Sequence, residues 1–532
     1  MGGRNTGVGP PASSPPPIVA VTDALTDDSS DQSIGRLARG GTANLLGAAI
    51  TGICTFALTV VVTRGISREA AGVFFSVTSL FLVATTVGQL GTQTGLVYFI
   101  ARSRAAGRAD RISAYVRTAM RPMLALAIVM AVVVFVLAGP LARITSPEHA
   151  HDAATYLRLL APFIPVAGVE IVLLAATRGL GFMKANALIE QIARPLAQLA
   201  LVAAATFATS TVVLGLAWSI AYVPAAIAAW FAFRRISRRT RAGSAGSVAA
   251  ADEPVGKEFW KFTIPRSLTS IIQILMQRFD IVLVGALSGA VNAAVYAAAT
   301  RFIVVGQLGI NALTLAAQPQ FAEKITTDRH RAANELYQIT TAWLVVVTWP
   351  IYLVLIVFAE PVLRVFGHGY SSGDTVIILI AASMLLSTGL GMVDTVLAMA
   401  GHTSWNLANA LLALGANIGL DFWLIPHHGI VGAAIGWATA IVVRNVAAAL
   451  QVAIAMRFQP VARSGIVAVL LAVTCFAAVP VVCRVILGDS GSGLFVSLAI
   501  GCVAYLAGLR AFRIPLRLDS LTSLRRRRLS TG

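Results

Sequence analysis

The stretch TIPRSLTSIIQILMQRFDIVLVGA, residues 263–286, is an apolar run long enough to cross a lipid bilayer as a helix. A crossing needs about 20 predominantly apolar residues. The run holds only three charged side chains, Arg266, Arg278 and Asp280, and Pro265 lies near its start. Ionisable groups at bilayer depth are costly, so they usually face a protein interior or a water-filled cavity. The stretch therefore predicts a membrane helix that carries functional groups.

The composition of the chain extends this interpretation to its whole length. Hydrophobic residues make up 57% of the 532 positions and charged residues 12%, whereas a soluble domain is about 25% charged. The net charge of +18 could indicate nucleic acid, but the basic residues form short clusters between apolar runs. We therefore expect no nucleic-acid partner and an all-α polytopic membrane protein. The four cysteines lie inside apolar runs without metal-ligand spacing.

Further apolar runs resemble the first and predict about fourteen membrane helices. The expected spans are 43–64, 71–100, 119–143, 157–177, 188–208, 212–233, 263–286, 291–318, 337–359, 375–400, 404–425, 430–456, 464–486 and 493–509. With a cytoplasmic N-terminus, 30 of the 41 Lys and Arg residues fall in cytoplasmic segments. Since cytoplasmic loops of membrane proteins are enriched in these residues, both termini are expected in the cytoplasm. Five arginines are left for the outer segments and their margins: Arg64, Arg68, Arg143, Arg364 and Arg484.

The chain also repeats itself at a spacing of about 220 residues, which predicts two six-helix lobes. VGQLG occurs at Val87–Gly91 and again at Val305–Gly309, and VLGLAW ending at Trp218 is echoed by AAIGW ending at Trp437. Repeated helical halves are typical of secondary transporters. The expected division is a disordered cytoplasmic tail (1–35), an N-terminal lobe (36–233), a cytoplasmic linker (234–262), a C-terminal lobe (263–456), two added helices (457–509) and a basic cytoplasmic tail (510–532).

An enzyme is the weaker class of function for this chain. Acid–base or metal chemistry at a membrane face calls for carboxylates that converge in sizeable loops. The best-equipped outer loop, TSPEHAHDAAT at 145–155, is more simply interpreted as a solvated loop, as is the pair His427–His428. No Walker loop is present. We expect no catalytic residue, no metal and no cofactor.

Ionisable residues within the predicted spans are the candidate site residues. Arg278 and Arg301 fall at a similar depth, and together with Arg266 they predict a cationic wall suited to phosphate oxygens. The alternative is a structural Asp280–Arg301 bridge between adjacent helices. Glu190 and Arg194 are spaced as an intrahelical pair. The candidates for ion coupling are the acids in the spans: Glu170, Asp280, Asp394 and Asp421.

Several motifs occur in the order and spacing of a known family. Pro265, Asp280, Tyr296 and Arg301 follow one another across the seventh and eighth predicted spans. RGISREAAGVFF (64–75), AMAGHTSWN (398–406) and NIGLDFWLIPHHGIVGAAIGWATA (417–440) match further turns. The chain resembles the polysaccharide exporter and O-antigen flippase family of the multidrug/oligosaccharidyl-lipid/polysaccharide flippase superfamily, over roughly residues 36–456. Ala293–Ala294 departs from the family pattern, which often has a glycine before the aromatic residue.

The resemblance implies a flippase of the bacterial plasma membrane. Its substrate would be a polyprenyl-(pyro)phosphate-linked sugar or oligosaccharide, moved from the inner to the outer leaflet by two rocking lobes during cell-envelope polysaccharide or glycolipid synthesis. Membrane lipids would be partners, as would glycosyltransferases or a polymerase of the same pathway. Two alternatives stay open, a multidrug or cation antiporter of the same superfamily and a non-transport scaffold of a polysaccharide assembly complex.

Overall fold

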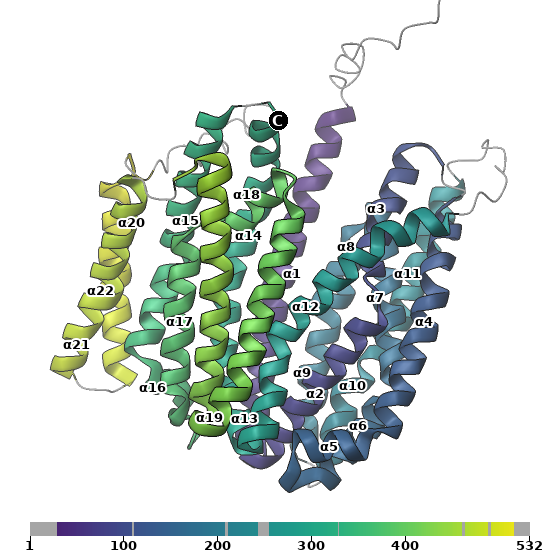
Figure 1. Ribbon diagram of the computed structural model, residues 1–532, viewed down its shortest axis with the longest axis horizontal. Coiled ribbons are helices and arrows are strands. Elements are labelled where there is room, and N and C mark those ends of the chain that lie inside the picture. Colours follow the sequence, from purple (N-terminus) through teal and green to yellow (C-terminus); the bar gives the residue numbers. More distant parts are fainter. Residues whose placement is uncertain are drawn as a thin grey trace, which may run out of the picture.

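The computed structural model describes residues 29–514 and Leu516, apart from 109–110, 208–210, 243–254, 328, 460–462 and 488–490. The described residues form helices joined by short turns, with no strand among them (Figure 1). The predicted all-α fold is confirmed. The first helix begins at Ser29, inside the predicted tail 1–35, and residues 1–28 and most of 510–532 lie outside the described residues.

The N-terminal half of the chain builds one group of helices. Ser67 caps the second of them, since its hydroxyl accepts a hydrogen bond from the backbone N–H of Ala70. The helices are α1 (Ser29–Gly65), α2 (Arg68–Gly88), α3 (Thr92–Ala105), α4 (Ile112–Val136), α5 (Ala138–Thr145), α6 (Ala150–Leu160), α7 (Phe163–Gly179), α8 (Met183–Asn186), α9 (Arg194–Ala205), α10 (Thr211–Ile220) and α11 (Tyr222–Ala242). A π-helical segment, Ala187–Ala193, connects α8 to α9.

The C-terminal half builds a second group of helices. Its members are α12 (Gly256–Ser288), α13 (Ala290–Ala299), α14 (Ile303–Thr326), α15 (His330–Val357), α16 (Ala359–Leu363), α17 (Asp374–Gly389), α18 (Val393–Met399), α19 (Thr403–Met456), α20 (Arg463–Val473), α21 (Val479–Leu487) and α22 (Gly491–Ala511). Short turns of 3-10 helix, Thr300–Phe302 and Arg364–Phe366, follow α13 and α16.

Helix α19 is a hairpin of two antiparallel helices rather than one rod. Gly429 has non-helical dihedrals, φ 55° and ψ −132°. On either side of it, the amides of Asn409 and Gln451 exchange hydrogen bonds of 2.8 and 2.9 Å. A side chain on Gly432 would strike the backbone of Leu424 at 2.5 Å. These contacts pair positions progressively further from Gly429, so the chain folds back at that residue.

The predicted count of fourteen spans is not confirmed. Among the described residues, ten helices are long and apolar enough to cross a membrane when the α19 hairpin is counted once, and two bent pairs raise that number to twelve. The expected run 71–100 is divided into α2 and α3 at Leu90 and Gly91, which have positive φ, and the run 375–400 is divided at Gly391. Phe495–Ala511 is a shorter apolar helix. The described chain is a multi-pass membrane protein by the length and composition of its helices.

The two groups of helices meet along α2, α12 and α13 and diverge toward the end of the molecule where α3 and α18 lie (Figure 1). Gly72 of α2 permits the closest approach, since a Cβ there would lie 1.8 Å from the carbonyl oxygen of Ala290. Helices α20 to α22 pack outside the second group, beside α15.

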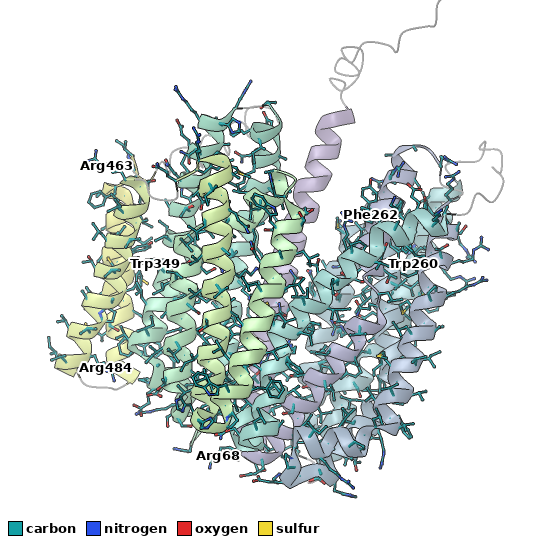
Figure 2. The ribbon with its side chains drawn as sticks, in the orientation of Figure 1. Arg68, Trp260, Phe262, Trp349, Arg463 and Arg484 are labelled. Carbon is teal, nitrogen blue, oxygen red and sulfur yellow. The ribbon has the colours of Figure 1, made fainter. Side chains whose placement is uncertain are left out.

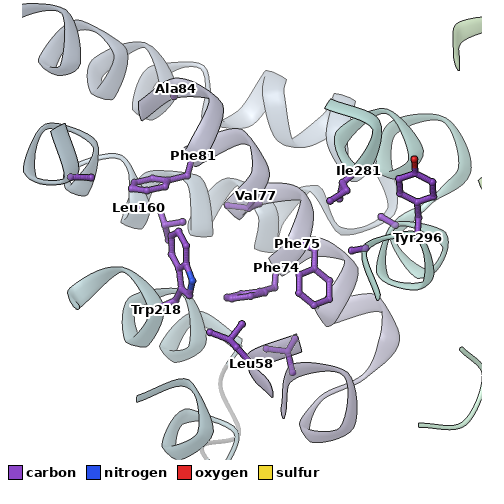
Figure 3. Packing of buried hydrophobic residues seen from close by; sticks show 14 of the residues in the cluster. Leu58, Phe74, Phe75, Val77, Phe81, Ala84, Leu160, Trp218, Ile281 and Tyr296 are labelled. Atoms are coloured by element: carbon purple, nitrogen blue, oxygen red, sulfur yellow. The ribbon is translucent and has the colours of Figure 1, made fainter. Parts of the chain in front are cut away.

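The aromatic residues of α2 form the centre of the largest hydrophobic cluster (Figure 3). Phe81 contacts the Trp218 ring of α10 edge-on at 5.4 Å between centroids. On the other side of α2, Phe75 lies near Ile281 of α12 and Tyr296 of α13. Because one helix supplies core residues to both halves, the halves share a continuous core at this end of the molecule.

Candidate functional site: a cationic cavity beside a carboxyl pair

Two of the three predicted substrate-binding arginines line one small cavity, whose lining residues all belong to the C-terminal half. Arg278 reaches it from α12 and Arg301 from the 3-10 turn Thr300–Phe302. That turn lies where α13 and α14 bend by 40°, so the guanidinium group sits at a break in the helix pair. The cavity measures ≈ 90 Å³ and is also lined by Gln307 and Trp437.

Neither arginine of the cavity forms an ion pair with a described acid. The Nε atoms of Arg278 and Arg301 are buried and have no hydrogen-bond partner among the described residues. The predicted alternative of an Asp280–Arg301 bridge is wrong, because no ion pair joins these two described side chains: Asp280 Oδ2 accepts a 2.9 Å hydrogen bond from Tyr296, and Asp280 Oδ1 and Arg301 Nε have no partner. Arg301 instead lies 5.7 Å from the centre of the Phe75 ring. The cavity therefore presents two cations that form no ion pair, although the Asp280 carboxyl group also lines it.

Arg266, the third predicted arginine, lies elsewhere on α12 and is not among the residues that line this cavity. Its guanidinium group covers the Phe262 ring at 3.6 Å and donates to the carbonyl oxygen of Phe262. Twelve helical positions separate it from Arg278, roughly 18 Å along an ideal helix. Phe262, labelled in Figure 2, in turn stacks on Tyr98 of α3 at 4.3 Å between ring centroids. This contact attaches the start of α12 to the N-terminal half.

Asp280 and Asp421, two of the predicted coupling acids, are brought together in a buried polar cluster. Their side chains are 3% and 0% exposed and lie within hydrogen-bonding reach of each other. Asn417 donates a 3.0 Å hydrogen bond to Asp421 Oδ2. The Oδ1 atoms of both aspartates accept no hydrogen bond from a described residue. Oxygen atoms arranged in this way can hold a proton or a small cation, since two adjacent carboxylates would otherwise repel each other.

The other two candidate acids are paired with arginines. Asp394 Oδ2 lies 2.7 Å from a guanidinium nitrogen of Arg444, and Glu170 Oε1 lies 3.3 Å from Arg194 Nε. Arg194 therefore bonds Glu170, and the predicted intrahelical pair with Glu190 is wrong. Glu170 is fully buried whereas Glu190 is half-buried, so Glu170 has the greater need of a countercharge. The Arg194 guanidinium also covers the Tyr222 ring at 4.9 Å.

The loop residues considered for a metal are not grouped in the structure. Within the described part of the chain, no three His, Cys, Asp or Glu side chains are placed to hold a metal ion together. His427 Nδ1 lies 2.9 Å from the carbonyl oxygen of Trp423, one turn earlier.

Two partners of the acid pair were missed as site residues by sequence reasoning. Tyr296 was noted only as part of a motif, although it is the donor to Asp280. Asn417 stands four positions before Asp421, a spacing that places both side chains on one helix face. That spacing was a signal that could have identified the Asn417–Asp421 bond from the sequence.

Comparison with known families identifies this architecture. The model of the polysaccharide biosynthesis protein family matches residues 37–325, more than half of the chain. The chain belongs to this family. The model of a second family, MatE, matches residues 265–423 of the same chain. Together the two matches confirm the multidrug/oligosaccharidyl-lipid/polysaccharide flippase superfamily predicted from the motifs. A search of curated proteins found no match.

Solved structures of the same superfamily share the fold at low sequence identity. The lipid II flippase MurJ in an inward closed conformation is 12% identical, with a TM-score of 0.68 over 89% of this chain and 98% of that chain. A multidrug resistance MATE transporter in its inward-facing conformation is 15% identical, with a TM-score of 0.60 over 78% of this chain and 98% of that chain. The outward-facing conformation of a MATE transporter has a TM-score of 0.53 at 15% identity, over 79% and 95%. At these identities the neighbours, a flippase and transporters, show that this chain shares their fold.

Proposed function

We propose that this protein flips a polyprenyl-(pyro)phosphate-linked sugar or oligosaccharide from the inner to the outer leaflet of the bacterial plasma membrane. Both termini would lie in the cytoplasm, and the product would enter cell-envelope polysaccharide or glycolipid synthesis. Glycosyltransferases would supply the substrate, and a polymerase or transferase would consume it. The observation that carries the proposal is the pair Arg278 and Arg301, which line one cavity and form no ion pair with a described acid.

Phosphate chemistry explains why two such arginines favour this substrate class. A guanidinium group presents planar donors that match the oxygens of a phosphate or diphosphate, and hydrogen bonds between charged groups are stronger than neutral ones. A buried cation without a counterion is costly for the protein alone. An anionic head group would remove that cost when it binds.

Alternating access requires one closed and one open end, and the contacts of the described residues support this geometry. At the end carrying Gly72, three rings, Phe56, Phe302 and Phe366, meet with centroid distances of 5.3, 5.4 and 5.6 Å. Phe56 belongs to the N-terminal half and the other two to the C-terminal half. The predicted orientation makes this the outer end.

We further propose that Asp280 and Asp421 bind the coupling ion, a proton or a monovalent cation. Asn417 and Tyr296 would orient the carboxyl oxygens, since each donates to one of the aspartates. Asp280 lines the same cavity as Arg278 and Arg301, so an ion held there adjoins the substrate site. Asp394 and Glu170 are less suited, because each already has an arginine partner.

A reconstituted flipping assay tests the proposed function. The protein is placed in liposomes that contain a fluorescent polyprenyl diphosphate-linked sugar. A chemical quencher removes the fluorescence of the lipid in the outer leaflet, so the rate of quenching reports flipping. We expect Arg278→Gln and Arg301→Gln each to slow flipping about tenfold or more, since each removes charge-assisted hydrogen bonds to phosphate. Arg143→Gln is the control, because this arginine lies away from the cavity. Unchanged flipping in the double variant would contradict the proposal.

The same liposomes distinguish a multidrug antiporter, which the MatE match over 265–423 keeps as the second candidate. An antiporter would exchange a cationic dye for protons or cations. Dye transport that survives Arg278→Gln and Arg301→Gln, with no flipping of the lipid-linked sugar, would establish that alternative. A scaffold without transport activity would move neither probe.

A further inference from the structure

A second cationic cavity lies at the seam between the halves, at the end closed by the three phenylalanine rings. This seam pocket measures ≈ 590 Å³ and is lined by Arg64, Arg364, Gly367, His368, Gly369 and Ser371. Arg64 comes from the end of α1, and the remaining residues come from the turn between α16 and α17. Both halves of the protein therefore contribute to one pocket. Arg68, labelled in Figure 2, lies at the same end of the molecule.

Most of the arginines predicted on the outer side of the membrane lie at the seam pocket. Only five arginines belong to the predicted outer segments and their margins, and three of them, Arg64, Arg68 and Arg364, meet at this seam. The acids beside them are Glu360, paired with Arg364 at 2.9 Å, and Glu69, adjacent to Arg68. The cluster has more cations than anions, and His368 adds a further group able to carry positive charge.

The two seam arginines that come from the N-terminal half, Arg64 and Arg68, donate hydrogen bonds to neutral groups of the C-terminal half. Arg64 Nε donates to the carbonyl oxygen of Val365 at 2.7 Å, and its Nη2 donates to that of Arg364 at 3.2 Å. Arg68 Nη1 donates to the carbonyl oxygen of Gly369 at 3.4 Å. A guanidinium group has five N–H donors, so Arg64 keeps further donors for another ligand. Backbone carbonyls do not cancel its charge, so the pocket stays cationic.

From this geometry we infer that the seam pocket binds a phosphate or diphosphate group at the outer face. The inference rests on the proposed function where it identifies that group as the head group of the flipped lipid. Phosphate oxygens would compete with the carbonyls of residues 364–369 for the donors of Arg64 and Arg68. The same bonds hold the two halves together, so binding of the anion would loosen the closed end. Arrival of the head group and opening toward the outer leaflet would thus be one event.

Calorimetric titration of inorganic pyrophosphate tests the seam pocket in the full-length protein, purified in phosphatidylcholine nanodiscs. The background carries Arg278→Gln and Arg301→Gln, which removes the cavity lined by these two arginines as a binding site. Adding Arg364→Gln or His368→Gln should weaken pyrophosphate binding, by about tenfold for Arg364. Adding Arg143→Gln, another predicted outer arginine that does not line the pocket, should change nothing. Replacing Arg364 by lysine instead (Arg364→Lys) should keep part of the pyrophosphate affinity, because the positive charge is retained. A loss of affinity caused by misfolding would not depend on that charge.

Equal pyrophosphate affinity in the Arg364→Gln and Arg143→Gln proteins would overturn the inference. The outcome is separate from that of the proposed function. Suppose that restoring Arg278 and Arg301 adds no pyrophosphate binding, while Arg364→Gln still removes it. The proposed substrate site at Arg278 and Arg301 is then contradicted, and the phosphate site in the seam pocket is supported. Nanodiscs containing phosphatidylglycerol identify the source of the phosphate. A bound phospholipid head group would weaken pyrophosphate binding in the anionic nanodiscs, whereas a pocket reserved for diphosphate would bind equally in both, and either result supports a phosphate site.

Discussion

The hydroxyl of Tyr296 donates a 2.9 Å hydrogen bond to Asp280 Oδ2, joining α13 to α12 beside the cationic cavity. Both side chains are buried, at 1% and 3% exposure. Asp280 Oδ1 has no hydrogen-bond partner among the described residues, and Asp421 lies beside the same carboxyl group. Asp280 thus belongs to the acid pair and also lines the cavity of Arg278 and Arg301.

Removal of this donor should affect both stability and ion coupling. Tyr296→Phe leaves a buried acceptor without its partner, which costs about 1–3 kcal/mol. Thermal denaturation should show the loss of stability, and the flipping assay should show a weaker response to an ion gradient. Tyr505→Phe is the control, because Tyr505 donates to the neutral carbonyl oxygen of Val346 far from the site. A Tyr296 variant that loses stability but keeps the full gradient response would reduce Tyr296 to a structural role.

Neutralising the acid pair should uncouple transport from the ion gradient. Asp280→Asn or Asp421→Asn keeps the shape of the side chain and removes the charge that would retain a proton or cation. Flipping driven by an imposed proton or sodium gradient should fall to the rate without a gradient. Asp394→Asn is the comparison, since Asp394 is paired with Arg444 and should affect stability instead. Unaltered gradient stimulation in both site variants would exclude the pair as the coupling site.

A methyl group at Gly436 should disrupt the same site from the second arm of the α19 hairpin. A Cβ at this position would lie 2.2 Å from Asp421 Oδ1, so the carboxyl group would have to move. We expect Gly436→Ala to reduce gradient-driven flipping strongly. Gly419→Ala is a matched control on the first arm, because a Cβ there meets nothing within 4 Å. Alanine in an open helical position should stabilise by about 0.5–1 kcal/mol, which thermal denaturation would detect. Equal activity of the two variants would argue against the predicted displacement of Asp421.

The Glu170–Arg194 pair should behave as a structural element of the N-terminal half. Glu170→Gln removes one partner of a buried ion pair and should destabilise the protein by about 3 kcal/mol or more. The double variant Glu170→Leu, Arg194→Leu removes both charges and should recover much of that loss. Thermal denaturation of the three proteins is the measurement. If the single variant is as stable as the original protein, the pair contributes less than its burial indicates.

Much of the architecture could be predicted from the sequence because its cause is local. The length and apolarity of each run determine whether a segment can be a membrane helix, and the family motifs are contiguous in the chain. Thus α12 and its charged residues were expected. The breaks at Gly91 and Gly391 were not, because an apolar run looks the same whether its helix is continuous or interrupted.

Partner choice among the buried charges was decided by the tertiary structure. The sequence by itself determined that Asp280, Asp421, Arg278 and Arg301 lie within apolar segments, where an ionisable group needs a partner or a cavity. Only the packing of α12 against the α19 hairpin brought Asp421 to Asp280, and only the turn after α13 placed Arg301 in one cavity with Arg278. Helix spacing constrains neighbours within one helix, whereas contacts between helices depend on crossing angles and depths that no single segment encodes.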